Sequence, residues 1–237
     1  MEISVIVPAL NEEKYIEDCL KSILNQTFPR KRYEIIVSDG ASTDNTGKIA
    51  KRYADRVVVS KKRGIWWGRN YGAKFAKGKY LVFIDADTVL DKDYLETVYP
   101  YLEKGYVGVS TCFNFSGKSA SIRIANCISY YYWIFSDIIG KTGLFGFNMC
   151  MPNRTFIKTG GFKNLDLEDV RIYKDLSKEG KINRIWKKKV TTSSRRLEKF
   201  GLLGALRYYS ELYVLESKNS KGRIRTSLSK YGKYIKV

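Results

Sequence analysis

The run from Tyr80 to Ile84 restricts the fold most strongly, because it is nearly all apolar and ends at Asp85-Ala86-Asp87. A strand that is apolar on both faces is typical of a parallel sheet covered by helices on both sides. Side chains two residues apart on a strand point to the same side, so the two carboxylates can reach one cation. Taken alone, the acidic pair is equally compatible with a solvated turn. The run therefore predicts a buried central strand, and its two acids are a candidate cation site.

Before Asp87 the sequence alternates between strand and helix patterns. Expected strands are residues 3–7, 33–38, 56–60 and 80–84, and expected helices are residues 12–25, 44–53 and 66–76. Asn11 is the expected N-cap of the first helix, with Leu20, Ile23 and Leu24 facing the sheet, and Ser42 or Thr43 is the expected cap of the second. This alternation predicts an α/β fold with a doubly wound, mostly parallel sheet.

After Asp87 the pattern is less regular. We expect helices at residues 92–103, 154–159, 167–178 and 202–215, strands at 107–115, 145–151 and 182–190, and an aromatic amphipathic segment at 122–139. No internal repeat or low-complexity linker divides the chain. We therefore expect one domain over residues 1–217, with halves at 1–90 and 91–217, followed by a basic tail at 218–237.

The chain has no histidine, which removes the usual general base, the imidazole metal ligand and every histidine-dependent catalytic triad. Its chemistry is therefore expected to use carboxylates and a hard cation, Mg²⁺ or Mn²⁺. A net charge of +19 favours anionic partners such as nucleotides, nucleic acid or an anionic membrane. Four widely spaced cysteines and the absence of a secretory signal pattern favour a cytoplasmic location.

Four segments together carry a family resemblance. They are Ser4-Val-Ile-Val-Pro-Ala-Leu-Asn-Glu-Glu, Val37-Ser-Asp-Gly-Ala-Ser-Thr-Asp-Asn-Thr, the stretch from Gly64 through Arg69-Asn70-Tyr-Gly to Asp87, and Gly160-Gly-Phe with Glu168-Asp169. In this order they closely resemble the family 2 glycosyltransferases, which have the GT-A fold, and the resemblance extends from about Ser4 to Arg196. It implies an inverting transfer of a sugar from a nucleotide-sugar donor to an acceptor hydroxyl.

The resemblance implies that the donor lies across the first strand ends, where open α/β sheets bind ligands. Residues matching the family's donor-binding positions are Pro8, Ala9, Asn11 and Glu12 beside the nucleoside, Asp39 with Gly40 at the base, and Arg69 near the nucleotide. Ala9 and Leu10 replace the commoner hydroxyl and aromatic residues. For Asp39 the alternative is a cap of the turn at Gly40, and for Arg69 an exposed helix arginine.

The resemblance also implies a metal site and a catalytic base. Asp87 matches the direct ligand of Mn²⁺ or Mg²⁺, and Asp85, separated from it by Ala86, is shared between the ribose and the metal. Asp169 matches the base that takes the proton of the acceptor hydroxyl, and Glu168 precedes it at the acceptor site. Alternatively, both acids only favour the start of a helix through its dipole.

Basic residues near the end of the matched region are relevant to diphosphate binding and to the number of sugars transferred. The Gln-x-x-Arg-Trp run of processive synthases is absent, which favours addition of a single sugar. Arg195 and Arg196 lie where non-processive relatives carry a basic motif, and they are candidates for gripping the diphosphate or a phosphorylated acceptor. A solvated basic turn is the alternative. UDP-sugars are the family's commonest donors, although GDP-mannose users share these motifs.

An aromatic segment at residues 128–147 has two interpretations. It contains no run of eighteen apolar residues, so a spanning helix is not expected. One interpretation is core packing around the acceptor site. The other is an interfacial surface, because Tyr130, Tyr131, Tyr132 and Trp133 are residue types that favour headgroup depth. With the basic tail, it would hold the enzyme at an anionic membrane near a glycan or lipid-linked acceptor.

Two other functions stay open at this point. A nucleic-acid-binding protein would explain the positive charge and the basic, aromatic tail, but the ordered acidic motifs would repel phosphates and disfavour nucleic acid as a partner. A nucleotide-binding protein with the same fold and no transferase activity would keep the fold without the chemistry, although the intact acids argue against it.

Overall fold

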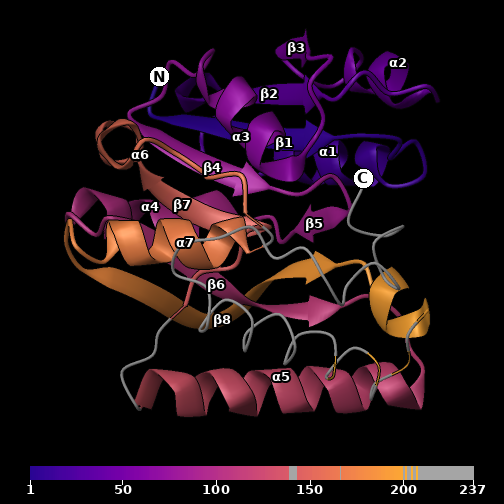
Figure 1. Cartoon of the computed structure of the whole chain (residues 1–237), viewed down its shortest axis with the longest axis vertical. Helices are drawn as coiled ribbons and strands as arrows, with labels where there is room; N and C mark the ends of the chain where they lie inside the picture. The colour runs from indigo at the N-terminus through magenta and orange to yellow at the C-terminus, as the bar shows by residue number, and fades with distance from the viewer. Residues whose placement is uncertain (139–142, 166, 200, 202–203, 205–206, 208–237) are drawn as a thin grey trace.

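The computed structural model describes residues 1–138, 143–165, 167–199, 201, 204 and 207. One sheet runs through them in the order β3-β2-β1-β4-β7-β6-β8-β5 (Figure 1). The strands are β1 (Ile3–Ala9), β2 (Tyr33–Asp39), β3 (Arg56–Val59), β4 (Tyr80–Ile84), β5 (Thr88–Leu90), β6 (Gly108–Phe115), β7 (Asn148–Pro152) and β8 (Ile182–Thr192). The helices are α1 (Ile16–Leu24), α2 (Thr46–Ala50), α3 (Ile65–Ala73), α4 (Tyr94–Glu103), α5 (Ala120–Ile138), α6 (Asn153–Thr159) and α7 (Glu168–Leu176), with a short 3₁₀ turn η1 (Arg30–Arg32).

The first four strands along this order form a parallel unit. β1 pairs in parallel with β2 and with β4, and β2 pairs in parallel with β3. β4 has the predicted bounds, and each of its five side chains is buried. Because parallel strands end at the same edge, Ala9, Asp39 and Asp85 come together there, and this edge carries most of the candidate residues.

The second half of the chain completes the sheet with mixed pairing. β7 is antiparallel to β4 and β6, whereas β6 and β8 are parallel and β5 is antiparallel to β8. The predicted α/β class with a mixed, mostly parallel sheet is therefore confirmed. β5 was missed by sequence reasoning, because three residues are too few to show a period.

Helices cover both faces of the sheet. The larger core lies under α1 and α4, and the second core lies under α3, α6 and α7. Leu20 and Ile23 of α1 are fully buried, as their spacing predicts, whereas Leu24 is partly buried. The two cores fix the sheet between helical layers and hold the strand ends in place.

Two predicted helix starts were wrong. α1 begins at Ile16 and not at residue 12, and Asn11 is not its cap but has a left-handed backbone with φ of 55°. α2 begins at Thr46, with Asn45 at the cap position, and not after Ser42 or Thr43. In both loops the polar side chains bind one another across the strand ends instead of capping a helix.

The aromatic amphipathic segment expected at 122–139 corresponds to α5, which covers residues 120–138 and is the outermost element at the bottom of Figure 1. None of the described helices combines the length and apolar character needed to cross a bilayer. The predicted helix at 202–215 lies largely outside the described residues, and the tail at 218–237 lies wholly outside them.

Candidate active site

The site is built around the carboxyl end of β4. After Ile84 the chain turns at Asp85, whose carbonyl accepts the amide of Thr88 at 3.1 Å, and continues into β5. β5 pairs with the end of β8, with Thr88 opposite Thr192. The amide of Ser193 donates to the Asp87 carbonyl at 3.2 Å. This pairing brings a segment more than one hundred residues away next to the two acids.

Arg69 of α3 joins two parts of the site. Its Nη2 donates to Oδ1 of Asp85 at 2.8 Å, and its Nη1 donates to Oε1 of Glu168 at 2.6 Å. Only 2% of the Arg69 side chain is exposed, and its Nε has no hydrogen-bond partner in the structure. A charge so buried requires this pairing, because an unpaired one would cost several kcal/mol. The role of Arg69 toward the nucleotide stays a prediction, since both terminal nitrogens already bind carboxylates.

Two glycines allow close packing of the helix that carries Arg69 and of the Arg69 guanidinium itself. At Gly72, one turn further along α3, a Cβ would lie 2.6 Å from Cγ2 of Ile6, so the helix packs directly on β1. At Gly146, a Cβ would lie 2.9 Å from Nη2 of Arg69. Sequence reasoning did not identify Gly146, because only the folded chain places it against the guanidinium.

Glu168 and Asp169 form the first turn of α7. Burial raises the pKa of Glu168 to about 7, an effect that Arg69 opposes and the charge of Asp169 reinforces. Burial also raises the pKa of Asp169, opposed by Arg69 and by hydrogen bonds from the amides of Val170 and Gly146. The Val170 amide donates to Oδ1 at 2.8 Å. Two neighbouring acids with raised pKa values, one held by arginine, suit a proton-accepting role.

A second arginine binds the other strand-end acid. Arg195 donates to both oxygens of Glu12, at 2.7 and 2.8 Å, and its Nη2 lies 3.1 Å from Oδ2 of Asp87. Burial and the charge of Asp85 raise the pKa of Asp87 to about 6, and Arg195 opposes that rise. The sequence identified Glu12 and Arg195 separately, but no local signal pairs residues 183 positions apart.

The loops after β1 and β2 are linked by their polar side chains. Oδ1 of Asn11 accepts the amide of Thr43 at 2.9 Å, and the Asn11 amide donates to Oγ of Ser42 at 3.0 Å. Oδ1 of Asp39 accepts the amide and hydroxyl of Ser42 at 2.9 and 2.6 Å. The amide of Gly40 donates to the Ala9 carbonyl at 2.8 Å. These bonds support the turn-capping alternative for Asp39, and its role toward a base stays a prediction.

The candidate residues therefore fall into connected groups. One group joins Asp85, Arg69 and Glu168, and a second joins Glu12, Arg195 and Asp87. Pro8, Ala9 and Ala86 are buried beside these groups, while Arg196 is exposed. Asp39 and Asn11 belong to the neighbouring loop cluster.

The donor set suits a hard cation that is shared with a substrate. Among the described residues, no group of three or more histidine, cysteine or acidic side chains forms a ready metal cage. Asp85 and Asp87 instead offer two carboxylates, and Mg²⁺ is commonly held by one or two carboxylates completed by substrate phosphates. Burial, followed by the charge of Asp85, raises the pKa of Asp87 to about 6, and a divalent cation beside the carboxylate would favour its charged form.

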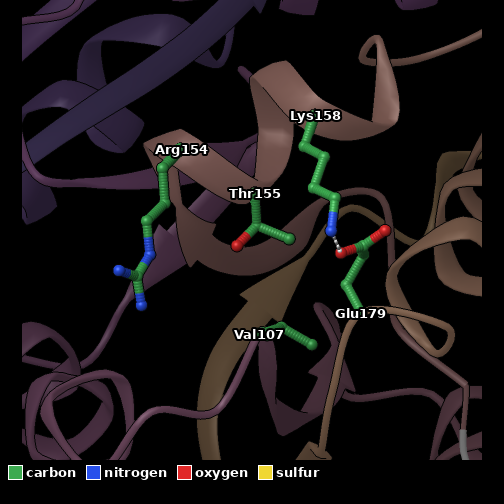
Figure 2. Close-up of a pocket in the computed structure, with 5 residues that line it drawn as sticks. All are labelled: Val107, Arg154, Thr155, Lys158 and Glu179. Atoms are coloured by element: carbon green, nitrogen blue, oxygen red, sulfur yellow. Dashed lines mark ion pairs between the residues drawn. The ribbon is translucent and has the colours of Figure 1, made fainter.

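A hollow elsewhere on the molecule does not take part in this site. Figure 2 shows its lining, which is Val107, Arg154, Thr155, Lys158 and Glu179, around a volume of about 250 Å³. Lys158 and Glu179 form an ion pair with each other. Val107 precedes β6, so the hollow lies at the end of that strand away from Thr192 and the two acids, and it contains none of the candidate residues.

Comparison with known sequences identifies a family. The model described as "Glycosyl transferase family 2" matches residues 4–163. Poly(ribitol-phosphate) beta-N-acetylglucosaminyltransferase TarS of Staphylococcus aureus strain MW2 is 32% identical over 115 residues, 46% of this chain and 20% of the relative. Glycosyltransferase GlyG of Streptococcus pneumoniae serotype 4 is 36% identical over 134 residues, 54% of this chain and 40% of the relative. The chain thus spans less than half the length of either relative.

Comparison with solved structures identifies the fold. S. aureus TarS 1–349 in complex with UDP-GlcNAc matches with a TM-score of 0.65 and 22% identity, over 81% of this chain and 58% of that chain. Mannosyltransferase PcManGT from Pyrobaculum calidifontis, in complex with GDP-Man and Mn²⁺, matches with a TM-score of 0.65 and 21% identity, over 93% and 65%. The predicted GT-A fold is confirmed.

Proposed function

Because the chain belongs to glycosyl transferase family 2, we propose that it transfers one sugar from a nucleotide-sugar donor to an acceptor hydroxyl, with inversion at the anomeric carbon. Residues 1–90 form the donor half of a single domain over 1–217, and residues 91–217 form the acceptor half. A UDP-sugar is the proposed donor. TarS, which this chain resembles, has been solved with UDP-GlcNAc, and PcManGT with GDP-Man, so GDP-sugars are the second donor class to test.

One observation carries this proposal. Arg69 binds Asp85 and Glu168 at the same time, at 2.8 and 2.6 Å. A buried guanidinium is rigid, so it holds the donor-side acid of β4 and the acidic start of α7 at a fixed separation. Transfer requires that the anomeric carbon of the donor and the catalytic base both lie next to the same acceptor hydroxyl. The Arg69 bridge supports this arrangement, because it fixes the distance between the donor-side acid and the start of α7.

Asp169 is the proposed base. Its carboxylate takes the proton from the acceptor hydroxyl while that oxygen attacks the anomeric carbon and the bond to the nucleoside diphosphate breaks on the opposite side. The amides of Val170 and Gly146 orient this carboxylate. General-base assistance of this kind contributes roughly 10²–10⁴-fold in rate. Glu168, held by Arg69, orients the start of α7 and lines the acceptor site.

Asp85 and Asp87 are the proposed ligands of Mn²⁺ or Mg²⁺, with Asp87 direct and Asp85 shared with the ribose. A cation held by these two carboxylates would neutralise charge on the leaving diphosphate. Arg195 donates to the same diphosphate, and Arg196 supports it. Pro8, Ala9, Asn11 and Glu12 border the nucleoside, while Asp39 and Gly40 face the base.

The acceptor is proposed to be a glycan or a lipid-linked molecule, reached by the enzyme at the cytoplasmic face of an anionic membrane. The exposed aromatic residues of α5 and the net charge of +19 support a membrane location.

Transfer assayed across a panel of UDP- and GDP-sugars, with Mn²⁺, Mg²⁺ or EDTA, tests the proposal. We expect release of the nucleoside diphosphate with one donor class and loss of this release in EDTA. The Asp169→Asn variant should lose nearly all transfer activity and keep its affinity for the donor. Turnover by Asp169→Asn close to that of the wild type would refute the assignment of the base. A thermal shift by an oligonucleotide and none by any nucleotide sugar with Mn²⁺ would favour the nucleic-acid alternative instead.

A further inference from the structure

The outward face of α5 is apolar from Ile124 to Ile138. Tyr131, Phe135 and Ile138 are 68%, 61% and 76% exposed. The exposed residues that we name the α5 face are Ile124, Cys127, Ile128, Tyr131, Tyr132, Phe135 and Ile138. Their spacing of three or four residues places them on one side of the helix. The outer side of a surface helix is normally polar, so this face is built to meet something other than water.

The other side of α5 already holds the helix to the domain. Asn126 exchanges hydrogen bonds with the backbone of Phe115, at 2.7 and 3.3 Å. Asp137 pairs with the buried Arg184 at 3.0 Å. Ile122 and Ala125 form a small core with Leu197. The inner side therefore anchors α5, and none of these anchoring contacts uses the α5 face.

We propose that the α5 face docks onto an anionic lipid bilayer, with the helix lying flat at headgroup depth. This rests on the membrane location in the proposed function and names the surface that makes the contact. The face combines isoleucine and phenylalanine, which enter the acyl boundary, with two tyrosines, which favour the interface. No acidic residue belongs to it, and the one acid of the helix, Asp137, is turned inward toward Arg184.

Charge around the face matches an anionic surface. Lys118, two residues before α5, and Arg123, in its first turn, are exposed. Trp186 of β8 is 39% exposed, lies 6.2 Å from the ring of Tyr130, and is followed by the exposed Lys187. Basic residues beside an apolar, aromatic face are the pattern of helices that bind anionic headgroups. The net charge of +19 adds a long-range attraction to the same surface.

The size of the face disfavours a second copy of the chain as its occupant. The 19 residues of α5 make a helix about 28 Å long and about 10 Å wide. Two such faces pressed together would bury roughly 600 Å², below the roughly 1,200–2,000 Å² of specific interfaces. A bilayer has no such requirement, since each inserted side chain contributes separately.

Docking would bring the candidate active site to the membrane. Leu197, which packs on the inner side of α5, lies two residues after Arg195. The segment that binds Glu12 and Asp87 therefore rests on the docked helix. This places the Asp87 and Arg195 end of the site on the membrane side of the molecule, where the polar end of a lipid-linked acceptor is found.

The test is binding of the full-length chain to phosphatidylglycerol vesicles, measured by co-sedimentation at low salt. We expect Tyr131→Ser with Phe135→Ser to lower the partition coefficient about tenfold or more, because two interfacial anchors are lost. Ile157→Ser on α6, at a residue 70% exposed, is the matched control and should change binding by about twofold at most. Thermal melting of each variant checks that it is folded.

A second measurement needs no variant. Part of the tryptophan fluorescence should be quenched by brominated phosphatidylglycerol, because Trp133 lies on the docked helix and Trp186 lies beside it, whereas the other two tryptophans lie on α3. Absence of quenching, or equal vesicle binding by the double variant and the wild type, overturns the proposal. Equal binding to neutral phosphatidylcholine vesicles overturns its anionic part. A dimer that the double variant abolishes, without vesicle binding, assigns the face to a second copy and also overturns it.

Donor turnover without vesicles separates this proposal from the proposed function. A wild type that binds vesicles but turns over no nucleotide sugar contradicts the transferase assignment alone. A wild type that turns over the donor but does not bind vesicles contradicts the proposal for the α5 face alone.

Discussion

Two arginines bind the neighbouring acids of one strand end, and their surroundings differ. Arg69 is 2% exposed and divides its two terminal nitrogens between Asp85 and Glu168. The Arg195 side chain is 38% exposed and binds Glu12 through both nitrogens, with Asp87 at 3.1 Å. A buried arginine shared by two acids cannot leave without stranding charges, whereas a partly exposed one can exchange partners in solvent.

This difference separates a fixed region from an exchangeable one. The Arg69 region ties the centre of the sheet to α7 and belongs to the framework of the site. The Arg195 region sits on the segment after β8, at the edge of the sheet, and covers Asp87 with a cation. We infer that Arg195 keeps Asp87 and Glu12 compensated until a donor diphosphate and metal arrive.

Asp169→Asn tests the catalytic end of the fixed region. The amide keeps the shape of the side chain but cannot accept the proton, so kcat should fall by about 10²–10⁴-fold. The Kd for the donor should stay within about threefold of the wild-type value, because Asp169 is not placed among the donor contacts. Steady-state transfer and donor titration measure the two quantities. An equal loss in both would show that the residue holds the site together and is not the base.

Arg69→Met tests the framework itself. Removal of the guanidinium leaves Asp85 and Glu168 without their partner, and the free energy of unfolding should fall by about 3–5 kcal/mol. Chemical denaturation measures this change. Arg184→Met is the matched control, since the Arg184 side chain is also buried and pairs with Asp137 at 3.0 Å. Both variants should be destabilised, but only Arg69→Met should also weaken donor binding, and equal donor affinity in the two would contradict the bridging role.

Arg195→Gln tests the exchangeable region. The pair with Glu12 is partly solvated, so the unfolding free energy should change by only about 1 kcal/mol. Loss of a charge-assisted contact to the diphosphate should raise KM for the donor by about tenfold. Arg30→Gln, at a surface arginine paired with Asp55, is the control and should leave KM unchanged. A large loss of stability with unchanged KM would place Arg195 with the framework and remove the contrast.

The pH dependence of transfer tests the proposed base in the fixed region. The pKa of Asp169 is raised and that of Glu168 is raised to about 7, both chiefly by burial. A base works only when deprotonated, so kcat/KM should be highest at a pH above the apparent pKa of the pair and should decline as the pH falls through that pKa. One pH unit below the apparent pKa of the pair, the loss is about tenfold. A profile flat down to pH 5 would contradict this account, provided that melting curves show the protein folded.

Several elements could be predicted from local pattern. β4 was predicted with its observed bounds, because a five-residue apolar run that ends in acids is typical of a buried parallel strand. Strands β1 and β2 and the sheet-facing residues of α1 followed from the same periodicity. The four motif segments identified the family, because their order and spacing are specific even though each segment is common.

Other features had no local signal. The helix after Asn11 starts four residues later than its capping pattern suggests, because Asn11 and Ser42 bind across two strand ends instead. The edge strand β5 exists because β8 pairs with it. Gly146 and the partnership of Glu12 with Arg195 appear only when distant segments meet. The outward apolar face of α5 could not be told from a core-facing one by composition, since both carry the same residues.

By itself, the sequence determined the fold class, the family and the set of acids and arginines available for chemistry, because apolar periodicity and motif order are properties of the chain. The tertiary structure decided which acid each arginine binds and which side of α5 meets solvent. Those outcomes depend on long-range strand pairing and on burial, which raises the cost of any unpaired charge and so selects the partners. The acidic pair after β4 was visible in the sequence. That one of its acids pairs with the buried Arg69 and the other with the partly exposed Arg195 is seen only in the folded chain.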